Sequence, residues 1–177
     1  MPYGRASHPA AASITLVCAL HTGMRRGEVL GLRWENVNLA QRVIYILRSK
    51  AGKPREIPIT DQLAGTLEGL GPQPGGLVFR ISLSTVRRCF ASALEGANIL
   101  NFRFHDLRHT FASHYVMRTS DLPALQQLLG HSTLKMTQRY AHLSKQHLAL
   151  GMDTFSKGMP GVLSEKGVRF SDKTGAE

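Results

Sequence analysis

Cysteine, acidic residues and long apolar runs are all scarce in this sequence of 177 residues. Its two cysteines, Cys18 and Cys89, lie in neither a CxxC nor a Cys/His-rich pattern, which argues against a disulfide framework and a zinc ribbon. The mostly apolar run over residues 10–20 is too short to span a membrane and leads directly into the polar stretch HTGMRRGE. The sequence therefore predicts a globular, cytoplasmic protein without a membrane segment.

The shortage of acidic residues leaves a large positive charge. Asp and Glu number 12 against 22 Lys and Arg, which gives a formal net charge of +10 at pH 7. A surplus of this size favours a polyanionic partner over a neutral small molecule, so nucleic acid is the first partner to expect. The sequence also lacks a P-loop and a carboxylate cluster for Mg²⁺, so we expect neither a metal nor another cofactor.

The expected fold is a single α+β domain that is mainly helical with one small antiparallel sheet. The β-branched stretch 41–48, the turn SKAGKP and the alternating stretch 55–59 predict a β-hairpin with Lys50 and Lys53 at its tip. Residues 77–79 predict a further short strand. Apolar spacing and capping residues predict helices over 9–21, 26–32, 61–70, 82–96, 105–118, 121–130 and a last segment containing Met136 and Tyr140, followed by a tail from residue 151.

The stretch HDLRHTFASHY, which begins at His105, contains three histidines in eleven positions. His105 and His109 lie four residues apart, as the zinc ligands of an HExxH motif do. However, Asp106 replaces the glutamate base of that motif, and Arg108 would add positive charge beside a metal. We therefore expect no metal site, and we interpret His109, His114 and Asp106 as structural residues.

A different pairing in the same stretch suits an anion. His105 and Arg108 lie three residues apart on one helix face, so both can point at one anionic group. The forked guanidinium donors of Arg108 match phosphate oxygens. Taken alone, this pattern is also typical of an ordinary solvated helix face.

The motifs around His105 and Arg108 indicate what the two residues do. In order and in wording, TGMRRGEVLGLRW, SKAGKP, HDLRHTFAS and LGHSTLKMTQRYAHL resemble the catalytic domain of the tyrosine recombinases, or phage integrases, over about residues 10–148. The resemblance implies the fold of that catalytic domain. It also implies that the family's catalytic residues correspond to Arg25, Lys50, His105, Arg108, His131 and Tyr140.

The activity implied by this resemblance is DNA strand cleavage and rejoining by transesterification without a metal. Tyr140 would attack the scissile phosphodiester, forming a 3′-phosphotyrosyl bond and releasing a 5′-hydroxyl. Arg25 and Arg108 would stabilise the charge that develops on the phosphate. Lys50, on the hairpin, would protonate the departing 5′-oxygen.

Further residues have supporting roles in this interpretation. His105 is the expected general base, directly or through a water molecule, and His131 would donate a hydrogen bond to a phosphate oxygen. Glu28, three residues after Arg25, can hold the guanidinium of that residue. The candidates for contacts with the DNA backbone are Arg26, Arg33 and Lys53.

The expected organisation departs from that of the family in one respect. The chain begins only a few residues before its first expected helix, so we expect residues 1–150 to form the catalytic domain and the N-terminal core-binding domain to be absent. Residues 151–177 would be a tail that packs on its own domain or on a neighbouring protomer. The expected partners are double-stranded DNA and further recombinase protomers, as a tetrameric synapse on DNA and a monomer alone.

Two other functions fit the same residues. A type IB topoisomerase shares the tyrosine chemistry, but the small size and the wording TQRYAHL favour a recombinase, whether integrase or resolvase. A non-catalytic DNA-binding remnant is the other alternative, and the presence of all six candidate residues argues against it.

Overall fold

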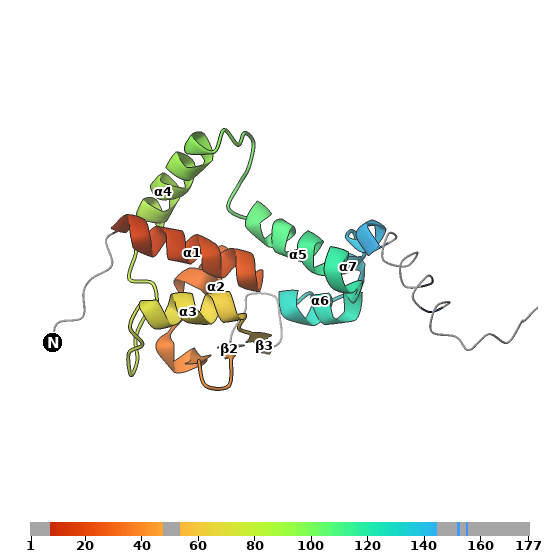
Figure 1. Cartoon of the computed structure of the whole chain (residues 1–177), viewed down its shortest axis with the longest axis horizontal. Helices are drawn as coiled ribbons and strands as arrows, with labels where there is room; N and C mark the ends of the chain where they lie inside the picture. The colour runs from red at the N-terminus through yellow and green to blue at the C-terminus, as the bar shows by residue number, and fades with distance from the viewer. Residues whose placement is uncertain (1–7, 48–53, 145–151, 153–154, 156–177) are drawn as a thin grey trace, which may run out of the picture.

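The structure, a computed structural model, describes residues 8–47, 54–144, 152 and 155 (Figure 1). The helices and the two strands of the hairpin follow the expected order, so the mainly helical α+β fold is confirmed. The helices are α1 (His8–Thr22), α2 (Arg26–Leu30), α3 (Asp61–Gly69), α4 (Leu83–Gly96), α5 (Asp106–Thr119), α6 (Leu122–Leu129) and α7 (Lys135–Gln138), with 3₁₀ turns η1 (Trp34–Asn36) and η2 (Ala141–Ser144). The strands are β1 (Val37–Asn38), β2 (Val43–Ile46) and β3 (Arg55–Pro58).

The three strands form one antiparallel sheet in the order β1-β2-β3. β2 and β3 pair from Val43 opposite Pro58 to Ile46 opposite Arg55, which confirms the predicted hairpin. The predicted hairpin tip, with Lys50 and Lys53, lies outside the described residues. β1 was not expected, because a strand of two residues has no alternating pattern to detect.

The strand predicted over residues 77–79 is absent from the structure. Leu77 forms only an isolated bridge with Arg33. The amide of Val78 donates to the Leu32 carbonyl at 2.9 Å, and the amide of Trp34 donates to the Gly76 carbonyl, also at 2.9 Å. The prediction was wrong because the two segments meet over this single bridge and do not continue as a ladder.

The main hydrophobic core lies between α1, the sheet and α3, and α1 also contacts α2, α4 and α5. The alternating pattern of β2 turns Ile44 and Ile46 inward, where they meet Ile57 of β3. Leu63 and Leu67, four residues apart on α3, are fully buried against them. This core fixes the position of the hairpin relative to the end of α1.

A second apolar cluster joins α5, α6 and the segment after α7. Asp121 caps α6, since its carboxylate accepts a hydrogen bond from the Ala124 amide at 2.8 Å, and Gly130 ends the helix with φ +62°. Ser120, with φ +55°, makes the turn between α5 and α6. The cluster consists of Ala112, Val116, Leu125, Leu129 and Tyr140, with Phe111, Tyr115, Leu122 and Leu143 packed against it.

The last predicted helix is shorter than expected. We expected it to contain both Met136 and Tyr140, but α7 spans only Lys135–Gln138. The amide of Tyr140 bonds to the Thr137 carbonyl at 3.0 Å, and the amide of Leu143 bonds to the Tyr140 carbonyl at 3.0 Å. These three-residue hydrogen bonds tighten the chain after α7, so Tyr140 lies in a turn and not in a helix.

Candidate active site

One cleft, with a volume of about 410 Å³, brings together residues that lie far apart in the sequence. Five of the six predicted catalytic residues line it, from the start of α2, the start of α5 and the segments on both sides of α7. The sixth, Lys50, lies outside the described residues, as does Lys53. The lining residues are Arg25, His105, Arg108, His109, His131, Lys135, Met136, Arg139 and Tyr140.

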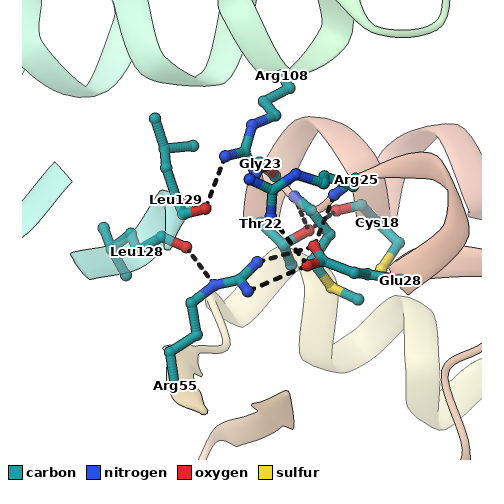
Figure 2. A network of polar contacts seen from close by, with 10 residues as sticks. Cys18, Thr22, Gly23, Arg25, Glu28, Arg55, Arg108, Leu128 and Leu129 are labelled. Carbon is teal, nitrogen blue, oxygen red and sulfur yellow. Dashed lines mark hydrogen bonds and ion pairs between the residues drawn. The ribbon is translucent and has the colours of Figure 1, made fainter. Parts of the chain in front are cut away.

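Arg108 is the most deeply buried cation of the cleft, with 4% of its surface exposed. Its guanidinium donates to the Gly23 carbonyl at 2.7 Å and to the Leu129 carbonyl at 2.6 Å (Figure 2). These carbonyls stand at the C-terminal ends of α1 and α6, where the helix dipoles favour positive charge. Burial and the nearby Arg25 lower the pKa of Arg108 to about 10, so the group stays protonated at neutral pH.

Arg25 precedes α2 and is held by Glu28, as the sequence predicted. The Arg25 amide donates to Glu28 Oε2 at 2.8 Å, and its Nη1 lies 3.3 Å from Glu28 Oε1. The first bond satisfies a backbone donor at the start of α2. The second orients the guanidinium, whose side chain is 29% exposed and lines the cleft.

Arg55 of β3 is a component of the site that the sequence analysis missed. Its Nη1 and Nη2 donate to the two oxygens of Glu28 at 3.1 and 2.8 Å, and its Nε donates to the Leu128 carbonyl at 2.8 Å (Figure 2). A signal was present, because residues 55, 57 and 59 share one strand face and the other two are buried isoleucines. A charged residue in such a row indicates a buried partner.

The network around Glu28 is strongly positive. Figure 2 shows the guanidinium groups of Arg25, Arg55 and Arg108 gathered between the end of α6 and the start of α2. Burial raises the pKa of Glu28, but hydrogen bonds from Arg55 and from the Arg25 amide outweigh this effect, so the net shift is downward. The network thus contains three cations and one carboxylate, and this excess of positive charge favours binding of an anion at the cleft.

His131 follows the glycine that ends α6. Its Nδ1 lies 2.9 Å from the Thr137 hydroxyl, and with that hydroxyl donating, the ring proton is on Nε2. Burial, followed by the charges of Arg108 and Arg25, lowers the pKa of His131 to about 4. At neutral pH this side chain is therefore a neutral hydrogen-bond donor.

Tyr140 is only 6% exposed, because its ring belongs to the cluster of α5 and α6. Its hydroxyl lies 2.5 Å from Nδ1 of His109. The interpretation of His109 as a structural residue did not anticipate this contact, since no local pattern connects positions 31 residues apart. His114, by contrast, is exposed and lies 3.4 Å from Arg118 on the same helix.

His105 stands directly before α5. Its ring meets the ring of His109 edge to face, with centroids 5.0 Å apart. Burial, followed by the charges of His109 and Arg108, lowers the pKa of His105 below its usual value. The ring is therefore mainly neutral at pH 7 and can exchange a proton with a group in the cleft.

The other predicted residues lie outside the cleft. Arg26 is exposed, and Arg33 pairs with Glu35 at 3.0 Å on the surface. Asp106 accepts a hydrogen bond from the Arg103 amide at 2.7 Å at the start of α5, which is a structural contact. Lys135 and Arg139 line the cleft although the sequence analysis did not select them.

The described residues also bear on metal binding and on membrane insertion. Across residues 8–47 and 54–144, no three His, Cys, Asp or Glu side chains are grouped so that they could hold a metal ion. In the same part of the chain, no helix has the length and apolar character that crossing a membrane requires.

Comparisons with known proteins cover all the residues that line the cleft. The model of the phage integrase family matches residues 5–147. The chain is 37% identical over 147 residues to the integrase of Escherichia phage 186, a match that covers 81% of this chain and 41% of that protein. It is 36% identical over 141 residues to the tyrosine recombinase XerC of Serratia marcescens, with coverage of 72% and 46%.

A solved structure shows the same similarity in three dimensions. The catalytic domain of the bacteriophage HP1 integrase superposes with a TM-score of 0.65 and 29% identity, over 86% of this chain and 93% of that domain. The match with the phage 186 integrase and that with XerC each cover less than half of the relative, at 41% and 46%.

Proposed function

Because the chain belongs to the phage integrase family, we propose that it is the catalytic domain of a site-specific DNA recombinase that acts in the cytoplasm. The domain would break and rejoin DNA strands by transesterification, with Tyr140 as the nucleophile and without a cofactor. The matched relatives are named integrase and recombinase, which favours this function over the topoisomerase alternative.

The observation that carries the proposal is the position of a tyrosine hydroxyl in a strongly cationic cleft. Tyr140 lines the same cleft as Arg25, Arg108 and His131. Two guanidinium groups and a neutral imidazole donor suit the equatorial oxygens of a phosphate that is changing from four to five substituents. The charges of Arg139 and Arg108 partly offset the effect of burial, which raises the pKa of the Tyr140 phenol.

The proposed reaction exchanges one phosphodiester for another. The Tyr140 oxygen bonds to phosphorus while the bond to the 5′-oxygen breaks, leaving DNA joined to the protein through a 3′-phosphotyrosine. Lys50, assigned from the sequence motif alone, donates the proton that the 5′-oxygen needs. Rejoining is the reverse attack by a 5′-hydroxyl, so the bond energy is conserved and no nucleotide triphosphate is consumed.

The remaining parts of the proposal concern organisation and partners. Residues 1–150 act as the catalytic domain, and residues 151–177 dock in cis or on a neighbouring protomer. The substrate is double-stranded DNA, on which four protomers assemble. The net charge of +10 supports binding to DNA through phosphate contacts, with Arg26, Arg33 and Lys53 as candidates.

A pool of nicked duplexes with randomised sequence around the nick tests the proposal whatever the target sequence is. Cleavage near the nick releases a short strand with a free 5′-hydroxyl, so the covalent adduct cannot be religated and accumulates. We expect an adduct with the wild-type chain and none with Tyr140→Phe. Tyr115→Phe, which removes a hydroxyl from the same apolar cluster, is the matched control and should keep the adduct. An adduct with Tyr140→Phe would contradict the proposal.

A further inference from the structure

The hydroxyl of Tyr140 has a partner that neither the family motif nor the proposed mechanism uses. His109 directly follows Arg108 on α5, and its Nδ1 lies 2.5 Å from the Tyr140 oxygen. Both side chains line the cleft. The contact is therefore made at the atom that would attack phosphorus.

Helix geometry explains why Arg108 and His109 of α5 reach different partners. Arg108 and His109 are adjacent, so their side chains leave the helix about 100° apart. Arg108 reaches inward to the carbonyls of Gly23 and Leu129, while His109 meets Tyr140. One turn of helix thus serves both the phosphate-binding network and the nucleophile.

The apolar cluster keeps this contact in place. The Tyr140 ring packs with Ala112 and Val116, which lie three and seven residues after His109 on α5. His105, one turn before His109, rests edge to face against its ring. The imidazole therefore lies between the ring of His105 and the Tyr140 hydroxyl.

The protonation states suit transfer of a proton from Tyr140 to His109. Burial, followed by the charge of Arg139, lowers the pKa of His109, while Asp106 acts in the opposite sense and Arg108 and Arg103 add to the lowering. Burial raises the pKa of Tyr140. At pH 7 a neutral phenol therefore faces a neutral imidazole, which is the arrangement that a general base requires.

We propose that His109 is the general base that accepts the phenolic proton of Tyr140, an inference that rests on the proposed role of Tyr140 as nucleophile. As the oxygen–phosphorus bond forms, the electron pair of the O–H bond goes to the oxygen and the proton moves to Nδ1 of His109. The resulting imidazolium returns the proton to Tyr140 when the strand is rejoined. His105, which was the expected base, is then left to contact the phosphate.

The transfer has to be concerted with attack. In the resting cleft the phenol holds its proton far more tightly than the imidazole would, so free tyrosinate does not accumulate. Once the oxygen begins to bond to phosphorus its basicity falls, and a base at hydrogen-bond distance then accepts the proton without further movement. Arg25 and Arg108 stabilise the charge that develops on the phosphate oxygens at the same moment.

A small phosphorylating probe tests this role in the full chain and needs no DNA target. Diisopropyl fluorophosphate phosphorylates a nucleophilic hydroxyl: an O–P bond forms, the P–F bond breaks, fluoride leaves and the phenolic proton passes to the base. Mass spectrometry of peptides measures the rate at Tyr140. We expect labelling of His109→Gln to be about a hundredfold slower than that of the wild type. His114→Gln, on the exposed face of the same helix, is the matched control and should label at the wild-type rate.

Two further readouts separate a base from a residue that only positions the hydroxyl. The wild-type rate should rise with pH as His109 loses its proton and then level off, whereas the His109→Gln rate should follow phenol ionisation and keep rising into alkaline solution. Imidazole added to His109→Ala should restore labelling. This comparison within a single variant does not depend on equal stability.

The outcomes distinguish the role of His109 as the base from the role of Tyr140 as the nucleophile. Labelling of Tyr140 in His109→Gln at or above the wild-type rate, or absence of imidazole rescue, overturns the role of His109 and leaves Tyr140 as the nucleophile. Labelling of other tyrosines with none at Tyr140 in the wild type overturns the proposed nucleophile and the base together.

Discussion

Glu28 and Arg55 form a buried, two-pronged ion pair, with side chains 8% and 6% exposed and a shorter contact of 2.8 Å. The pair joins β3 to Glu28, the residue whose carboxylate holds Arg25. Through Nε, Arg55 also bonds to the Leu128 carbonyl near the end of α6, just before His131. The start of α2, next to Arg25, and the end of α6, next to His131, are thus both fixed to one guanidinium.

Arg55→Met should therefore damage both stability and chemistry. It removes one partner of a buried pair and leaves the Glu28 carboxylate without its two hydrogen bonds from Arg55. We expect this loss to lower the free energy of unfolding by about 3 kcal/mol. Glu28, which holds Arg25, would lose its buried partner, and we expect the resulting displacement of Arg25 to slow adduct formation by about tenfold or more. Urea denaturation and the nicked-duplex assay measure the two effects.

Arg42→Met is the control for Arg55→Met. Arg42 and Asp61 also lie 2.8 Å apart, but their side chains are 46% and 100% exposed. A surface pair of this kind contributes little to stability, because solvent screens it, and neither residue lines the cleft. Equal losses of stability in the two variants would contradict the importance assigned to the buried pair.

Acidification should weaken the fold through Glu28. Its folded pKa lies below the usual value, because hydrogen bonds from Arg55 and the Arg25 amide outweigh burial. The unfolded chain therefore binds the proton more tightly, so the stabilisation is present above the unfolded pKa and is lost as the pH falls through the folded pKa. Urea denaturation at pH 7 and at about pH 3 should show a larger loss for the wild type than for Glu28→Gln; equal losses would contradict this.

Gly130→Ala should disturb the Glu28–Arg55 pair, because Gly130 lies next to the Arg55 side chain. Gly130 has φ +62°, and a Cβ there would lie 3.0 to 3.3 Å from the Arg55 side chain. We expect a loss of about 1–2 kcal/mol from the left-handed conformation. Gly65→Ala in the middle of α3, where a Cβ would meet nothing within 4 Å, should instead stabilise the protein by about 0.5–1 kcal/mol. Thermal unfolding of both variants checks the opposite signs.

His131 should stay neutral well into the acidic range. Burial and then Arg108 and Arg25 lower its folded pKa to about 4, against an unfolded value near 6.5. Between these values the unfolded chain binds the extra proton, so stability falls as the pH is lowered through this window. Nuclear magnetic resonance of the labelled ring nitrogens should report titration near pH 4. A midpoint above pH 6 would contradict the described environment.

Local signals in the sequence predicted the parts of the fold that depend on local chemistry. Asp121 and Gly130 mark the two ends of α6 because capping and left-handed termination are properties of single residues. The position of Tyr140 could not be obtained in this way. Its turn is set by packing against α5 and α6, and tertiary packing overrides the helical pattern of the residues before it.

The same distinction applies to the site. The family resemblance predicted five residues that line one cleft, because the family's motifs imply a known three-dimensional arrangement of the catalytic residues. These residues are Arg25, His105, Arg108, His131 and Tyr140. Arg55 and His109 were missed since their partners lie 27 and 31 residues away in the sequence. Such pairings arise from tertiary structure, and only the buried-face position of Arg55 gave a hint of one.

Tandem mass spectrometry of the trapped DNA adduct identifies the residue that attacks DNA. After nuclease and protease digestion, the peptide containing Tyr140 should carry a nucleotide joined through its 3′-phosphate. The released strand should have a 5′-hydroxyl, and EDTA should leave the yield unchanged. A nucleotide on any other residue, a 5′-phosphate linkage, or an adduct that requires a metal would contradict this mechanism.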